Sequence, residues 1–183
     1  MKVISGKYKG RILKGFNLDK TRPTMDRVKE SLFASIQDYI KDRVVLDLYA
    51  GTGNLGIEAL SNGAKEAYFV DINKDAINVI KNNIKILNID NTNIIKADAS
   101  KALNMFIKEN KIFDIIFLDP PYQTNELDKV LDIINNNINI LSDNALIVCE
   151  TELNIDYLKY NNLTTYKQKK YGSKIVNILK INN

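Results

Sequence analysis

The chain has 183 residues, of which 45% are hydrophobic and 26% are charged, and its formal net charge is +4. This length predicts one domain that buries enough apolar surface to fold without disulfide bonds. The presence of one cysteine and no histidine excludes an internal disulfide, a cysteine-rich metal site and any catalysis by imidazole.

The first 43 residues predict a small basic extension. Short apolar pairs at 3–4 and 12–13 flank a basic stretch with glycines, which is typical of a β-hairpin. Residues 25–40 then carry apolar side chains at helical spacing. This extension holds eleven Lys or Arg against five Asp or Glu, whereas the other 140 residues hold fifteen against seventeen. Such segregation favours docking of a polyanion, although an ordinary lysine-rich surface has the same composition.

From residue 44 to residue 183 the sequence predicts a core domain of alternating strands and helices. Near-continuous apolar runs predict five strands, at 44–49, 66–71, 93–98, 113–119 and 144–150. Amphipathic segments between them predict four helices, at 55–63, 74–87, 100–109 and 127–137. The tail, 166–181, predicts a hairpin that turns at Gly172 and Ser173. The whole pattern indicates an α/β fold: a mostly parallel seven-stranded sheet with helices on both faces.

A carboxylate stands at or near the end of each of the five predicted core strands. These are Asp47, Asp71, Asp98, Asp119 and Glu150. A single such acid commonly caps the helix that follows it. Because the carboxyl ends of parallel strands meet at one edge of the sheet, where ligands bind, five acids there predict a cavity rich in hydrogen-bond acceptors.

The glycine-rich segment "GTGNLG", residues 51–56, matches the dinucleotide-binding pattern G-x-G-x-x-G. In a nicotinamide site this loop seats a pyrophosphate, and Asp71, about 20 residues on, would hold a ribose. An acidic edge suits a pyrophosphate poorly. It suits S-adenosylmethionine, which has an ammonium, ribose hydroxyls, an adenine amine and a positively charged sulfur, and no phosphate.

The segment "FLDPPY", residues 117–122, contains two of the three prolines of the chain. Because proline has no amide N–H, the Asp119 carboxylate and the Pro120 carbonyl are acceptors without a local donor. The two N–H groups of an exocyclic base amine fit this pair, and Tyr122 offers a ring on which a base can stack. A strand-ending turn with a capping acid is the simpler interpretation of this motif when it is taken alone.

These motifs together resemble a known family over essentially the whole chain. "DLYAGTGNLG" with "FLDPPY" resembles the class I, S-adenosylmethionine-dependent methyltransferases that methylate amines. "ISGKYKGRIL", "TRPTMDRVKESLF" and "YGSKIVNIL" are similar to the bacterial RsmD family, which methylates N2 of a guanine in small-subunit (16S) ribosomal RNA. The resemblance implies a Rossmann-like class I methyltransferase fold, S-adenosylmethionine as the cofactor and small-subunit ribosomal RNA as the partner, within an assembled or assembling subunit.

The resemblance also implies roles for individual residues. Asp47, Gly51 and Gly53 would line the methionine end of the cofactor, Asp71 the ribose, and Asp98 the adenine amine. The implied cofactor-binding residues are Asp47, Tyr49, Gly51, Thr52, Gly53, Asp71, Ile72, Asp98, Ala99 and Asp119. The implied catalytic residues are Asp119, Pro120, Pro121 and Tyr122. The predicted RNA contacts are Lys7, Lys9, Arg11, Arg22, Arg27 and Lys170. A solvated basic turn is the alternative for Lys7, Lys9 and Arg11, and a surface pair with Glu30 is the alternative for Arg27.

Three other functions stay open on the sequence. A DNA or RNA adenine-N6 methyltransferase also carries D-P-P-Y, but residues 1–43 leave little room for a target-recognition domain. A nicotinamide oxidoreductase lacks an evident proton relay here, and a non-catalytic RNA-binding module has no need of the intact motif. No signal segment follows Met1 and no apolar run is long enough to span a membrane. We therefore expect a cytoplasmic monomer that uses neither a membrane nor a metal.

Overall fold

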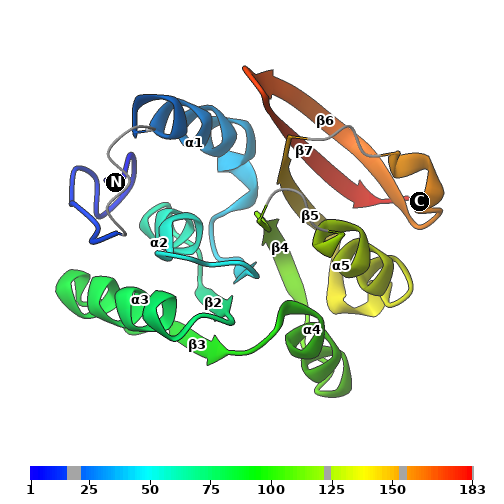
Figure 1. Ribbon diagram of the computed structural model, residues 1–183, viewed down its shortest axis with the longest axis horizontal. Helices are drawn as coiled ribbons and strands as arrows, with labels where there is room; N and C mark the ends of the chain where they lie inside the picture. Colours follow the sequence, from blue (N-terminus) through cyan, green and yellow to red (C-terminus); the bar gives the residue numbers. More distant parts are fainter. Residues whose placement is uncertain (16–21, 122–124, 153–155, 183) are drawn as a thin grey trace.

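The structure, a computed structural model, describes residues 1–15, 22–121, 125–152 and 156–182, without the side chains of 22–25. Across these residues seven strands form one sheet in the order β3-β2-β1-β4-β5-β7-β6 (Figure 1). Strands β1 to β5 run parallel, and β7 is antiparallel to both β5 and β6. The strands are β1 Val44–Asp47, β2 Glu66–Asp71, β3 Thr92–Lys96, β4 Phe113–Leu118, β5 Leu141–Thr151, β6 Leu163–Tyr171 and β7 Lys174–Ile181. The predicted seven-stranded, mostly parallel sheet is confirmed.

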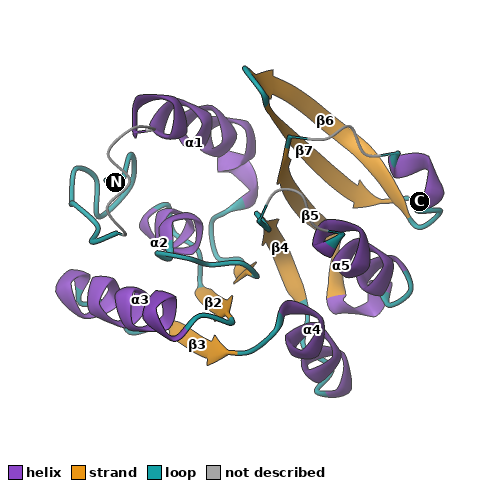
Figure 2. Cartoon of the chain, in the orientation of Figure 1, coloured by secondary structure: helices purple, strands orange, loops and turns teal. Residues whose placement is uncertain are grey.

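Helices cover both faces of this sheet, as predicted. Figure 1 shows α1, α2 and α3 on one side of the sheet and α4 and α5 on the other, and Figure 2 separates helices, strands and loops by colour. The helices are α1 Arg22–Ile36, α2 Asn54–Ser61, α3 Lys74–Leu87, α4 Ala99–Lys108 and α5 Glu126–Asn135, with short 3₁₀ helices at Gln37–Tyr39, Ile138–Ile140 and Tyr157–Lys159. In the part of the chain that the structure describes, no helix has both the length and the apolar character of a membrane span.

Two apolar cores lie on the two faces of the sheet. Alternate residues of each strand point to opposite faces, so that Val45 belongs to the core under α1 and α2, and Leu46 to the core under α4 and α5. Both residues are fully buried. A strand in a sheet covered on both faces has apolar side chains on both of its sides, so its sequence is a near-continuous apolar run. Runs of this kind predicted the covered sheet.

The N-terminal segment forms a hairpin-like loop that is docked on α2. One antiparallel bridge joins Lys2 to Ile12, and Val3 donates its amide to the Arg11 carbonyl at 2.9 Å. Val3 and Leu13 are buried in the same core as α1 and α2. The predicted hairpin is therefore present with a single bridge, and one residue of each apolar pair, Val3 and Leu13, anchors it to the core, whereas Ile12 is 78% exposed.

A buried charge pair also ties this hairpin to the core. The Glu58 side chain in α2 is fully buried and forms an ion pair with the equally buried Lys29 of α1, with Nζ and Oε2 2.8 Å apart. The Glu58 carboxylate also accepts the amides of Ile4 (3.0 Å) and Ser5 (2.8 Å), and Lys29 donates to the Lys2 carbonyl at 2.7 Å. One carboxylate thus connects the hairpin, α1 and α2.

Candidate active site

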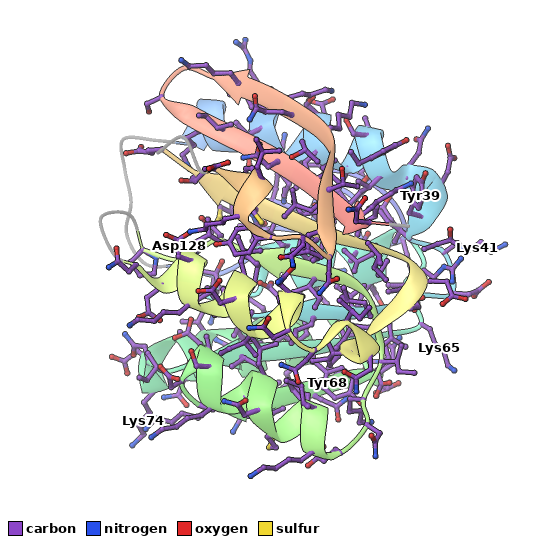
Figure 3. The ribbon with its side chains drawn as sticks, turned by 90° about the vertical axis from the view of Figure 1, so that its right-hand side faces the viewer. Tyr39, Lys41, Lys65, Tyr68, Lys74 and Asp128 are labelled. Carbon is purple, nitrogen blue, oxygen red and sulfur yellow. The ribbon has the colours of Figure 1, made fainter. Side chains whose placement is uncertain are left out.

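Two adjoining cavities open at the carboxyl edge of the parallel strands. Figure 3 marks the direction of the sheet: Lys65, before β2, lies at one end of the molecule, and Lys74 and Asp128, near the starts of α3 and α5, lie at the other. The larger cavity has a volume of about 980 Å³ and the smaller about 210 Å³. Both are lined by Tyr49, Gly51, Asp119 and Lys174.

The structure brings all five strand-end carboxylates to these two cavities. Asp71 and Asp98 line the larger cavity, Asp47 and Glu150 line the smaller, and Asp119 lines both. Two further acids of the larger cavity were not predicted, namely Glu126 at the start of α5 and Glu152 after β5. Among the described residues that line the larger cavity, Lys174 is the only cation.

Two of the strand-end carboxylates, Asp47 and Asp71, accept backbone amides of the glycine-rich segment 51–56. The Gly51 amide donates to Asp71 Oδ2 at 2.8 Å, and the Gly56 amide donates to Asp47 Oδ2 at 2.9 Å. Gly51 has a φ of +53°, and no atom outside its chain neighbours lies closer than 4.0 Å to a Cβ built on it. A Cβ on Gly56 would lie 2.3 Å from the ring of Phe69, so only glycine lets α2 approach β2 this closely.

The other residues of this loop divide between the cavity wall and the core. Thr52 lines the smaller cavity, as predicted for a cofactor contact. Gly53, by contrast, is buried and faces Ile57, Ile80 and Phe69, and it is not among the residues that line either cavity. A contact of the Gly53 backbone with the cofactor stays a prediction.

The part of the larger cavity that follows β2 and β3 combines two carboxylates, Asp71 and Asp98, with the exposed apolar side chain of Ile72. Asp71 accepts amides through both oxygens, Gly51 through Oδ2 and Asn73 through Oδ1, and each oxygen keeps a second lone pair for a ligand hydroxyl. Asp98 caps α4 by accepting the Lys101 amide, so the capping and cavity-lining interpretations both hold. Ile72 is 67% exposed beside them, an apolar surface suited to a flat ring.

Burial raises the pKa of two of the carboxyl groups towards neutrality. Loss of solvation raises the pKa of Asp47 to about 7, and the nearby charge of Asp71 adds to this effect. Loss of solvation also raises the pKa of Asp119 to about 7, with a further contribution from the charge of Glu150 and an opposing one from Lys174. A carboxyl group with such a pKa accepts hydrogen bonds when ionised and can take up a proton near neutral pH.

The D-P-P segment forms the wall beside Asp119. Pro120 is buried, Pro121 is exposed, and both line the larger cavity. The predicted stacking residue Tyr122 lies outside the described residues. Ala99 is buried at the start of α4 and also lines this cavity.

The Tyr49 hydroxyl is a polar group in the cavity wall that a ligand could hydrogen-bond. The Tyr49 hydroxyl is buried without a hydrogen-bond partner among the described residues, and burial raises its pKa. Tyr49 lines both cavities. A buried hydroxyl is costly to leave unpaired, so this site fits a ligand with polar groups.

The predicted RNA-binding cations lie on different surfaces. Lys7, Lys9, Arg11 and Arg27 are exposed, and Lys9 and Arg27 line a depression between the hairpin and α1. Arg22 begins α1, and its side chain lies outside the described part of the chain. Lys170 is exposed on β6, on the face opposite its neighbour Lys169, which donates to two serines of α1.

The fold and this cavity define a class of protein. The solved structure "Putative methyltransferase yhhF" from Escherichia coli superposes with a TM-score of 0.85 and 28% sequence identity, covering 99% of this chain and 97% of that one. The fold is therefore the Rossmann-like fold of the class I methyltransferases.

Within this class, the chain belongs to one particular family. The model of the family described as Conserved hypothetical protein 95 matches residues 1–180, and the chain belongs to this family, the RsmD family that the motifs predicted. It is 39% identical to "Putative rRNA methyltransferase YlbH" of Bacillus subtilis, over 94% of each chain. It is 36% identical to "Ribosomal RNA small subunit methyltransferase D" of Haemophilus influenzae, over 94% of this chain and 89% of the relative.

Proposed function

We propose that this protein transfers a methyl group from S-adenosylmethionine to the exocyclic N2 amine of a guanine in small-subunit ribosomal RNA. The observation that carries this proposal is the position of Asp119, whose carboxyl lies where the two cavities meet. The names of the relatives support ribosomal RNA as the substrate, and the sequence motifs support the guanine amine.

The residues present fit the cofactor. Asp71 would accept the ribose hydroxyls, Ile72 would lie against the adenine, and Asp98 would accept from the adenine amine. The backbone of Gly51 and the hydroxyl of Tyr49 would face the methionine portion. When bound, S-adenosylmethionine would supply a methyl carbon attached to a cationic sulfur; the N2 lone pair would attack this carbon, and the S–C bonding pair would leave with the sulfur as a neutral thioether.

Asp119 and Pro120 act on the base rather than on the methyl donor. Their oxygens would accept the two N–H groups of the amine, which fixes the nitrogen and turns its lone pair towards the methyl carbon. The new N–C bond leaves a positive charge on N2, and the amine then loses one proton to the Asp119 carboxylate. A pKa near 7 lets this group release the proton to solvent afterwards.

The acidity of the edge argues against a dinucleotide. Five acids line the larger cavity against the single described cation Lys174. A pyrophosphate would face like charges there, whereas the ammonium and sulfonium of S-adenosylmethionine would face opposite ones.

The basic extension, residues 1–43, supplies the proposed RNA surface, and residues 44–183 supply the methyltransferase core. The exposed cations Lys7, Lys9 and Arg11 would contact phosphates of the RNA. An extension of this size without a full RNA-binding domain favours a substrate in which ribosomal proteins help to hold the RNA, such as an assembled or assembling small subunit.

The variant Asp119→Ala tests this function. We expect methyl transfer to small-subunit particles from cells that lack this protein to fall by at least about 100-fold. Binding of S-adenosylmethionine, measured by calorimetry, should change only a few-fold, because the main partner of Asp119 is the base amine. Asp143→Asn, at an exposed position of β5, is the matched control and should keep full activity. Near-normal turnover by Asp119→Ala would contradict the assigned role.

A further inference from the structure

Three charged side chains stand on three neighbouring strands at the carboxyl edge. Asp119 follows β4, Glu150 lies in β5 and Lys174 begins β7, and the sheet order places β4, β5 and β7 side by side. Leu118 pairs with Cys149, so Asp119 and Glu150 each follow one of these paired positions. Glu150 pairs with Val176, and Lys174 lies two residues from Val176 on the same face.

Contacts confirm that these side chains converge. Lys174 Nζ forms an ion pair with Glu150 Oε1, and both side chains are partly exposed, at 21% and 16%. Asp119, Glu150 and Lys174 all line the smaller cavity, and Lys174 and Asp119 also line the larger one. From Asp119 to Lys174 the wall therefore presents an acceptor, an acceptor and a donor in consecutive order.

The Watson–Crick edge of guanine carries the complementary order. Its N2 amine and N1–H are donors, and O6 is an acceptor. We propose that Glu150 and Lys174 determine base specificity, with Glu150 accepting N1–H and Lys174 donating to O6 while Asp119 holds the N2 amine. This inference rests on the proposed function, and it adds how the same site selects its base.

The ion pair makes this arrangement suitable for a base edge. Glu150 alone would place a second negative charge beside Asp119, and Lys174 offsets that charge. An ionised glutamate only accepts and a lysine ammonium only donates. Adenine, with an amine in place of O6 and a bare N1, would set donor against donor and acceptor against acceptor. Such mismatches in a desolvated pocket reject the wrong base strongly.

The test compares two bases at the methylated position, after that position has been mapped by mass spectrometry. Reconstituted small-subunit particles carry there either guanine or 2-aminopurine, which keeps the N2 amine but lacks O6 and N1–H. The variants are Glu150→Gln and Lys174→Met, and the control is Lys180→Met, which lies further along β7 and contacts the Tyr39 hydroxyl. The measured quantity is the ratio of kcat/KM for guanine to that for 2-aminopurine. Because this ratio is taken within each variant, a partly unfolded preparation does not change it.

The proposal predicts a strong preference for guanine in the unmodified protein and a ratio smaller by roughly 10- to 100-fold in each variant. Glu150→Gln should also raise turnover on 2-aminopurine, because the amide nitrogen can donate to the bare N1. Calorimetry should show S-adenosylmethionine binding within about threefold of normal.

Unchanged base ratios in both variants would overturn the inference. If both variants lost S-adenosylmethionine binding while the base ratio stayed unchanged, Glu150 and Lys174 would be assigned to the cofactor instead, and the inference would also be overturned. No guanine methylation by the unmodified protein would refute the proposed function itself, which is a different result.

Discussion

The buried Lys29–Glu58 pair gives a sharp prediction about stability. In Glu58→Ala the ammonium of Lys29, which is 3% exposed, loses its counter-ion, and the amides of Ile4 and Ser5 lose their acceptor. Removing one partner of a buried ion pair typically costs about 3–5 kcal/mol. Because domains of this kind are stable by only about 5–15 kcal/mol, this one substitution should remove a large part of the free energy of unfolding.

Urea unfolding of the full chain measures this loss. The matched control is Lys129→Met, which breaks the exposed Glu126–Lys129 pair and should cost less than about 1 kcal/mol. Native-state hydrogen exchange should show faster exchange of the Ile4 and Ser5 amides in Glu58→Ala, since these amides lose their acceptor. A loss below about 1 kcal/mol with unchanged exchange at both amides would refute the reasoning that this pair clamps the hairpin.

Two further predictions concern the reaction and its substrate. Asp119 must be ionised to accept the amine, and its raised pKa is about 7, so kcat/KM should fall as the pH drops through about 7 and level off above it; a flat profile from about pH 6 to 8 would contradict this role. Replacing Lys7, Lys9 and Arg11 by Glu should weaken RNA binding and reduce the slope of log affinity against log salt by roughly 0.7–0.9 for each phosphate that the variant no longer neutralises. The control Lys108→Glu, at an exposed position of α4 on the other side of the sheet from the hairpin (Figure 1), should keep the original slope; an unchanged slope in the hairpin variant would show that these cations do not bind RNA.

Most of the fold could be predicted because its core strands are near-continuous apolar runs, whereas its helices carry apolar side chains at helical spacing. Helix α3 spans the predicted residues, since its buried side chains recur at helical spacing. Strand β5 begins at Leu141, earlier than the predicted start at Asn144. The prediction missed its first residues because the polar Ser142 and Asp143 interrupt the apolar pattern. Its Ser142 is held by a side-chain contact with Asp114 of β4, which no local pattern reveals.

The site was predictable where it follows from strand direction. Asp47, Asp71 and Asp119 meet because parallel strands end at one edge. Lys174 could not be assigned to the cavity, since its position depends on where the antiparallel β7 inserts into the sheet. Gly53 belongs to the predicted motif, and its burial beside Ile80 and Phe69 depends on how α2 packs against β2 and α3.

The buried pair was missed for a similar reason. Glu58 lies in a short, mostly buried helix. Nothing in the neighbouring sequence indicates that its carboxylate accepts hydrogen bonds from main-chain amides. Its partners Ile4 and Ser5 are more than 50 residues away in the sequence. Contacts of this kind become visible only when the hairpin is placed in space.

Calorimetric titration of the purified protein with S-adenosylmethionine and, separately, with NADH tests the central claim that an acidic carboxyl edge selects a cationic ligand without phosphate. We expect saturable binding of one S-adenosylmethionine per chain and no measurable heat of binding for NADH. Tight binding of NADH together with no binding of S-adenosylmethionine would contradict the claim.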